Sequence, residues 1–193
     1  MIDSDSKIIK EKAAALTEKC NSQKEKAIVL FYYVRDEIFY TPLPDSFSIT
    51  EYRASKTLRR GEGYCTQKAI LLTALARAAH IQSRLGFADV INHRIPEELF
   101  EKMGTNKFVY HGYSELWLNN RWVRATPAFN KELCNKLDIK PVEFDGEKDA
   151  VFHKRDKKGR THVKYVKYYG SYTDIPYDEM MQAFKEEYAK MNG

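Results

Sequence analysis

Cysteine is scarce in this sequence, with three among 193 residues, and no two of them have the short spacing of a zinc-ligand pair. Structural zinc sites need closely spaced ligands, and disulfide-stapled folds need an even set of cysteines. Neither is therefore expected, and at least one of Cys20, Cys65 and Cys134 should be a free thiol. We expect no metal ion and no cofactor.

Long apolar runs are also absent. The longest, residues 27–34 and 69–79, fall short of the roughly 20 residues that span a bilayer. The first twelve residues carry Asp3, Asp5 and Lys7, and they have no apolar core of a signal peptide. These absences predict a cytoplasmic protein without a membrane partner.

The charge is only mildly unbalanced, because 32 Lys and Arg residues face 27 Asp and Glu residues, a formal net charge of +5. The basic run at residues 153–160 is typical of a solvated hairpin tip, and no nucleic-acid motif accompanies it. We therefore expect no nucleic-acid partner, and binding through this run is a weaker alternative.

What the sequence does contain favours a packed domain. Its hydrophobic fraction is 43%, its aromatic fraction is 13%, and tyrosine alone accounts for 13 residues. Such a composition excludes intrinsic disorder. The length suits one core, and we find no linker and no repeat, so the prediction is a single domain over residues 1–193.

The first part of the chain has helical periodicity. Apolar residues recur at helical spacing over 7–20 and 24–39, and a short turn of helix is expected at 55–58. Residues 66–79 are apolar on nearly every side, which predicts a buried helix.

The second part changes to strand periodicity. Strands are predicted at 82–90, 108–118, 121–126, 149–153 and 161–169, with a hairpin turn at Asn119–Asn120. Short helices are predicted at 96–102 and 133–137, and a closing amphipathic helix at 176–188. Helices followed by an antiparallel sheet indicate an α+β fold.

The strongest chemical signal is Gly61-Glu-Gly-Tyr-Cys65 at the start of the buried helix. A helix N-terminus favours a thiolate and offers N–H groups to an oxyanion, and the glycines would leave room for a substrate. A lone cysteine is more often a small buried hydrophobe. The glycines and the following helix favour Cys65 as a nucleophile instead.

A thiol nucleophile needs a base, and His111 is the candidate. It begins the predicted hairpin, so we expect it to be a cross-strand neighbour of Ala125 or Thr126. A residue near position 126 would then hydrogen-bond the imidazole and fix its tautomer.

Two segments together resemble the transglutaminase-like superfamily. Gly61 to Cys65, the buried helix after it and the entry into the next strand at His80 to Arg84 together resemble its nucleophile motif. The segment from His111 through Glu115, Trp122 and Val123 to Pro127 resembles its histidine hairpin. The resemblance implies a papain-like core, with N-terminal helices and the cysteine-bearing helix packed on an antiparallel sheet.

The resemblance also implies site residues and a reaction. Cys65 would be the nucleophile and His111 the base, and Thr126 occupies the position of the family's catalytic aspartate. Asn130 is an alternative partner for the imidazole. The implied reaction is acyl transfer or hydrolysis on an amide of a protein or peptide through a thioester, leaning to a protease or amidase.

The replacement at Thr126 keeps a second function open. A hydroxyl can orient an imidazole, but it stabilises the imidazolium less than a carboxylate does. The alternative is a catalytically weak or inactive transglutaminase-like module that binds peptides. No calcium loop is visible, which argues against a calcium-activated cross-linking enzyme.

The remaining candidates have structural interpretations. We expect His80 to cap its helix, Cys134 to be packed, and Arg84 to form an internal ion pair. His93, His153 and His162 have no metal-ligand spacing with any cysteine or carboxylate. Tyr40 and Tyr64 are candidates to line the cleft or to stabilise an oxyanion.

Overall fold

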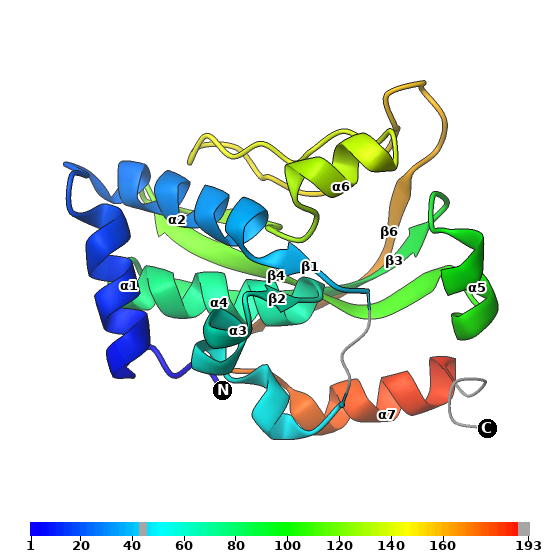
Figure 1. The fold of residues 1–193 in the computed structure, drawn as a ribbon, viewed down its shortest axis with the longest axis horizontal. Coiled ribbons are helices and arrows are strands. Elements are labelled where there is room, and N and C mark those ends of the chain that lie inside the picture. Colours follow the sequence, from blue (N-terminus) through cyan, green and yellow to red (C-terminus); the bar gives the residue numbers. More distant parts are fainter. Residues whose placement is uncertain (43–45, 189–193) are drawn as a thin grey trace.

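The computed structural model describes residues 1–42 and 46–188. The helices are α1 (Lys7–Thr17), α2 (Gln23–Glu37), α3 (Ala54–Arg60), α4 (Cys65–Ala78), α5 (Glu97–Met103), α6 (Lys131–Lys136) and α7 (Tyr177–Glu187), with a 3-10 helix η1 at Ile49–Tyr52 (Figure 1). The strands are β1 (Phe39–Tyr40), β2 (Glu62–Gly63), β3 (Ser83–Asn92), β4 (Lys107–Leu118), β5 (Arg121–Ala125) and β6 (Val163–Tyr172).

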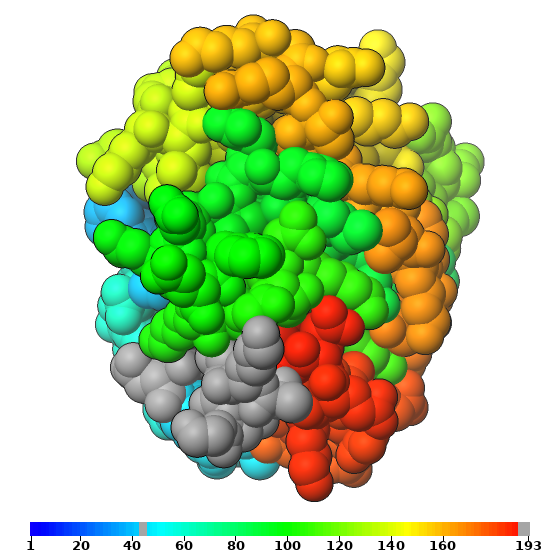
Figure 2. Space-filling view, turned by 90° about the vertical axis from the view of Figure 1, so that its right-hand side faces the viewer, coloured from blue at the N-terminus to red at the C-terminus, as the bar shows by residue number. Residues whose placement is uncertain are grey.

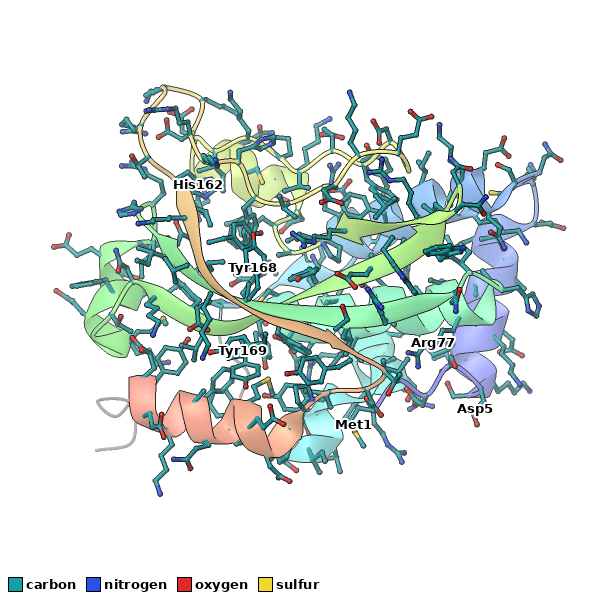
Figure 3. All side chains as sticks on the ribbon, turned by 180° about the vertical axis from the view of Figure 1, so that it is seen from behind. Met1, Asp5, Arg77, His162, Tyr168 and Tyr169 are labelled. Carbon is teal, nitrogen blue, oxygen red and sulfur yellow. The ribbon has the colours of Figure 1, made fainter. Side chains whose placement is uncertain are left out.

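A four-stranded antiparallel sheet with strand order β5-β4-β3-β6 forms the centre of the fold. Helix α4 packs against β4 and β3, and α1, α2 and α3 pack around α4. Figure 3 shows the molecule from behind, where β6 crosses in front of β3. The predicted α+β architecture, with N-terminal helices and a buried cysteine-bearing helix on an antiparallel sheet, is confirmed.

Helix α4 lies inside the protein as its sequence predicts. Every residue from Cys65 to Ala76 is buried, because nearly every side of the helix is apolar. Beyond the end of the helix, His80 has a left-handed φ of 64°, and the N–H of Ile81 donates back to the carbonyl of Ala76 at 2.8 Å. His80 thus caps the helix through its backbone, in the Schellman pattern.

The β4–β5 hairpin has a register that contradicts one prediction. Asn119 and Asn120 both have positive φ, as in a two-residue type I′ turn, and this turn places Leu118 opposite Arg121. The last pair of the ladder is Ser114 with Ala125, so His111 lies three residues beyond it. The expected pairing of His111 with Ala125 or Thr126 is therefore wrong, and His111 pairs with Ala88 of β3.

The predicted strand at 149–153 is also wrong. This segment makes one parallel bridge, between Ala150 and Ala125, and then leaves the sheet. The N–H of Thr126 donates to the carbonyl of Ala150 at 2.8 Å, but the next residue, Pro127, has no N–H with which to continue a ladder. The strand predicted at 161–169 exists as β6 and pairs with β3.

The basic run at 153–160 is exposed except for one residue, as predicted for a solvated tip. The buried exception is Asp156, whose carboxylate accepts from the N–H of Lys158 at 2.9 Å and from Nε of Arg160 at 2.7 Å. The acidic side chain therefore holds the turn closed, and the basic side chains extend into solvent.

No helix within residues 1–42 and 46–188 is both long and apolar enough to cross a membrane.

Candidate active site

The two glycines before Cys65 shape the chain entering α4. Gly61 has a φ of 74°, a left-handed conformation that ends α3. A Cβ at Gly63 would lie 3.0 Å from Oε1 of Gln67 and 3.3 Å from Cγ2 of Thr57. Gly63 therefore allows close packing against the first turn of α4. The expectation that this glycine leaves room for a substrate is wrong, because protein atoms fill the space beside it.

Side chains fix the first turn of α4 in place. The N–H of Tyr64 donates to Oε1 of Gln67 at 3.2 Å, and Nε2 of Gln67 donates to the carbonyl of Glu51 at 3.0 Å. The hydroxyl of Tyr64 donates to that of Tyr52 at 2.8 Å. Tyr64 therefore uses its hydroxyl within the core, whereas Tyr40 lines the cavity described below.

Close approach of β4 completes the surroundings of the sulfur. A Cβ at Gly112 would lie 2.8 Å from Cα of Thr66, so only glycine lets the strand come this near to the helix. Burial raises the pKa of the Cys65 thiol, while the backbone N–H of Gly112 and the hydroxyl of Thr66 oppose that rise. Burial outweighs the N–H groups around the sulfur, so this environment favours the thiol over the thiolate.

A β-bulge sets the position of His111. Opposite Asp89 of β3, strand β4 has two residues, Val109 and Tyr110, and Tyr110 has a φ of 51°. The carboxylate of Asp89 accepts from the N–H of Tyr110 at 3.1 Å, and the hydroxyl of Thr66 donates to the carbonyl of Tyr110 at 3.2 Å. The strained residue before His111 is thus held from both β3 and α4.

The imidazole of His111 is enclosed by aromatic rings. Its ring centroid lies 4.8 Å from that of Phe152 and 6.1 Å from that of Tyr165. The residue is 2% exposed, and burial lowers the pKa of His111 to about 3. The imidazole is therefore neutral at physiological pH, so Cys65 and His111 form a neutral pair at rest.

The polar atoms behind the imidazole lack partners. Within the described part of the chain, neither Nε2 of His111 nor Oγ1 of Thr126 makes a hydrogen bond, although both atoms are fully buried. Thr126 and His111 both lie beside Tyr165. Burial raises the pKa of that phenol, and the N–H of Phe152 lowers it. The buried Asn130 precedes α6 and also makes no hydrogen bond to Nε2.

Cys65 and His111 line the same cavity, of about 260 Å³. Cys65 keeps 8% of its surface exposed and forms part of the lining of this space. Figure 2 shows the side of the molecule where α5, α6 and the start of β6, the elements that contribute to the cavity wall, reach the surface. The structure thus brings Cys65 and His111 together and places Thr126 outside the cavity wall.

The opposite side of Cys65 is nearly closed. A space of about 20 Å³ remains there, lined by Pro42, Phe47, Tyr64, Cys65, Met103, Phe108, Val109, Phe184 and Tyr188. The rings of Phe47 and Phe184 lie 5.5 Å apart, and the hydroxyl of Tyr188 accepts from the N–H of Val109 at 2.9 Å. Helix α7 therefore covers this side, and the room near the sulfur lies toward α5 and α6.

A buried lysine ties α4 to the end of α2. The Nζ of Lys68 donates to the carbonyl of Arg35 at 3.0 Å and to that of Ile38 at 2.5 Å. Lys68 has no exposed surface, and this burial lowers its pKa to about 7. The interaction fixes the α2 C-terminus, directly before the strand that carries Tyr40 to the cavity.

The other candidates lie where structural roles predict them. Arg84 donates to Glu115 at 2.5 Å, and Cys134 is 1% exposed. His162 is buried at the start of β6 (Figure 3), and neither ring nitrogen has a hydrogen-bond partner among the described residues. No group of three or more His, Cys, Asp or Glu residues within 1–42 and 46–188 could hold a metal ion.

Sequence reasoning missed Gly112, Asp89 and Phe152. A glycine inside a predicted strand signals a bulge or a close backbone approach, so Gly112 could have been found. Asp89 was a charged residue in the apolar second half of the strand predicted at 82–90, which is a weaker signal. Nothing in the local pattern indicated that the ring of Phe152 packs on His111, because that segment was predicted as a strand.

Comparison with known proteins gives the family. A model of the transglutaminase-like superfamily matches residues 10–127, which is more than half of the chain. The protein therefore belongs to the transglutaminase-like superfamily. A comparison with curated proteins gives no match.

Two solved structures are similar to this chain. One is described as a "putative protease" from Parabacteroides distasonis, with 17% identity, a TM-score of 0.47, and coverage of 64% of this chain and 24% of that one. The other is described as a "putative cysteine protease" from Cytophaga hutchinsonii, with 16% identity, a TM-score of 0.47, and coverage of 90% and 51%. The chain thus spans about a quarter and about a half of their lengths.

Proposed function

We propose that the protein is a cysteine-dependent hydrolase or acyltransferase that acts on an amide of a protein or peptide, with Cys65 as nucleophile and His111 as base. The observation that carries this proposal is that the Cys65 sulfur, at the N-terminus of a buried helix, shares one cavity with the imidazole of His111. Membership of the transglutaminase-like superfamily supports it.

The neutral resting pair sets the order of events. Because burial raises the thiol pKa and lowers the imidazole pKa, His111 takes the proton of Cys65 during attack rather than before it. The sulfur forms a bond to the carbonyl carbon. Backbone N–H groups in the first turn of α4 would receive the oxyanion.

The second half of the reaction returns the enzyme to its starting state. The carbon–nitrogen bond breaks, and the leaving amine takes the proton from His111, so a thioester remains on Cys65. Water then attacks the thioester, its proton passes through His111 to the sulfur, and the acid is released. An amine in place of water would give transfer, and we favour hydrolysis.

A binding module without catalysis is the second candidate. The unpaired Nε2 of His111 and the hydroxyl at Thr126 favour it, because no described residue stabilises an imidazolium from behind. In that case the cavity would hold a peptide and no thioester would form.

Trapping the acyl-enzyme separates the two candidates. The protein is incubated with p-nitrophenyl hexanoate, quenched in acid, and examined by intact mass and peptide mapping. We expect one acyl group on Cys65, none in Cys65→Ala, and an unchanged adduct in the matched control Cys20→Ala, a half-exposed cysteine remote from the cavity lining. Acylation that survives in Cys65→Ala would overturn the proposal, and no adduct in the folded protein would favour the binding module.

A further inference from the structure

The cavity beside Cys65 has an apolar wall. Apart from Cys65 and His111, most of its lining is aliphatic or aromatic, contributed by Tyr40, Pro42, Val90, Ile95, Pro96, Leu99, Phe108, Phe129, Leu133, Leu137, Phe152 and Val163. Its volume of about 260 Å³ exceeds the roughly 150 Å³ of an apolar protein cavity that binds benzene. The space therefore suits an apolar group larger than a single unsubstituted ring.

Aromatic rings form a continuous series from the cavity wall to the base. The ring of Tyr40 meets that of Phe129 edge-on at 4.8 Å, and Phe129 stacks on Phe152 at 4.8 Å. Phe152 in turn lies 4.8 Å from the ring of His111. A group beside Phe129 and Phe152 would therefore be next to the imidazole, with ring edges and faces available for aromatic contacts.

Three polar residues, Asn92, Arg94 and Glu98, also line the cavity, and Nε of Arg94 makes no hydrogen bond to a described residue. The guanidinium of Arg94 lies 3.6 Å from the carboxylate of Asp156, and the side-chain oxygen of Asn92 accepts from the N–H of Arg94 at 2.9 Å. Glu98 is exposed on α5. An amide side chain such as that of glutamine would give up its hydrogen bonds to water among mostly apolar neighbours, which disfavours its binding there.

We infer that the cavity binds the acyl half of the substrate and selects a carbonyl compound with a bulky apolar substituent, of aromatic side-chain size, over acetyl or glutamine-type donors. The inference rests on the proposed function, because it takes Cys65 as the group that is acylated. With an ester, the sulfur–carbon bond forms and the carbon–oxygen bond breaks. The thiol proton passes through His111 to the leaving oxygen, and water then hydrolyses the thioester.

Two sources could supply such a group: the aromatic side chain of a peptide residue, or an unbranched acyl chain. The test compares kcat/KM for p-nitrophenyl esters of acetate, hexanoate, 3-phenylpropanoate and N-acetylglutamine. Burying a phenyl-sized group contributes about 2–3 kcal/mol, so we expect the phenylpropanoate to exceed acetate by about 30-fold or more. A larger value for hexanoate than for phenylpropanoate would overturn the aromatic assignment.

Variants that fill the cavity with a larger side chain test the same specificity, and each can be compared with a control variant outside the cavity. Leu133 and Leu99, both half-buried, line the cavity from α6 and α5. In Leu133→Trp and Leu99→Trp we expect the phenylpropanoate-to-acetate ratio to fall at least tenfold. Val166, 42% exposed on β6 and outside the cavity lining, gives the control Val166→Trp, in which the ratio should stay the same. Circular dichroism and melting temperature identify folded variants, and two positions guard against one failing to fold.

The outcomes separate this inference from the proposed function. If no ester acylates Cys65, the proposed function itself fails. If all four esters acylate Cys65 with similar kcat/KM, or if the glutamine ester is preferred, the nucleophile stands and the apolar specificity is wrong. An unchanged ratio in both folded tryptophan variants would also overturn it.

Discussion

The two sides of the imidazole differ in how fully their polar groups are satisfied. On the side of the sulfur, the bulge before His111 is held by Asp89 and by the hydroxyl of Thr66, and Gly112 lets β4 approach α4. On the far side, Nε2 of His111 and Oγ1 of Thr126 are buried, and neither makes a hydrogen bond to a described residue.

This difference shows which part of the site the fold determines. Cys65 and His111 are positioned by backbone features, a helix start and a bulge, that many local contacts support. In the proposed function, stabilisation of the charged imidazole would depend on one side chain, that of Thr126. The positioning of the pair and the strength of the base are therefore separate properties, and variants can change them one at a time.

A side chain that keeps β4 from approaching α4 closely should have the largest effect on acylation of Cys65. In Gly112→Ala the new Cβ would meet Cα of Thr66 at 2.8 Å, which is backbone and cannot move aside. We expect acylation of Cys65 to fall about 100-fold and the protein to lose about 1–3 kcal/mol of stability through overpacking. Stopped-flow acylation and urea unfolding measure the two effects. Unchanged acylation would show that this approach does not position the sulfur.

The unpaired histidines should make the protein sensitive to acid. Burial, with a contribution from His153, lowers the pKa of His162 to about 4, so between pH 6.5 and 4.5 the unfolded chain binds a proton that the native protein does not. Stability therefore falls as the pH falls. For His162 alone the loss is about 2 kcal/mol over this range.

The variant His162→Leu tests that loss. It removes the titrating group and keeps an apolar side chain of similar size, so its free energy of unfolding should fall less steeply between pH 6.5 and 4.5. The remaining slope should include His111, whose pKa is lowered to about 3 by burial. Urea unfolding at several pH values measures both proteins. Identical slopes would mean that His162 is not held neutral in the native state.

A carboxylate at position 126 should strengthen the weaker side of the site. In Thr126→Asp we expect the pKa of His111 to rise and acylation of Cys65 to become about tenfold faster, because a carboxylate stabilises the imidazolium that forms during attack. Thr126→Asn, which adds a polar group without charge, should give a smaller gain. NMR titration of His111 reports the pKa. A folded Thr126→Asp protein with unchanged pKa and rate would place Thr126 out of reach of the imidazole.

The smallest predicted effect is the contribution of Lys68, the buried lysine of α4, to the pH dependence of stability. Burial lowers the pKa of Lys68 to about 7, so between pH 7 and 10.5 the unfolded chain binds more protons and stability rises with pH. From pH 7 to pH 8 the expected rise is about 1 kcal/mol. Lys68→Met should remove this rise, whereas Lys24→Met, at a more exposed lysine, should keep it. Equal slopes in the two variants would contradict the assignment.

Local sequence signals predicted the fold and singled out two residues, Cys65 and His111, that line one cavity. The apolar surface of the helix that follows Cys65 predicted its burial, and the paired asparagines at 119 and 120 predicted the hairpin turn. Cys65 and His111, the proposed nucleophile and base, were singled out because each begins or precedes such an element. These signals lie within short segments of the sequence, so they can be recognised without knowledge of tertiary contacts.

Tertiary packing determines the features that the sequence did not predict correctly, namely the neighbours of His111 and the pKa of Cys65. The hairpin turn sets a register that carries His111 past the end of β5, and Pro127 then directs the chain out of the sheet, so the ring of Phe152 comes to lie on the imidazole. The pKa of Cys65 likewise depends on burial by neighbours remote in sequence. The spacing of residues in the sequence therefore predicts neither the packing of Phe152 on His111 nor the neutral state of Cys65 and His111.

The most direct test of this account measures the acylation of Cys65 by p-nitrophenyl hexanoate in the wild type and in His111→Gln, at pH 7 and with folding verified for both. If His111 takes the thiol proton during attack, its loss should slow acylation by about 100-fold or more. Equal rates in the two proteins would contradict the central claim that the imidazole and the sulfur act as a pair.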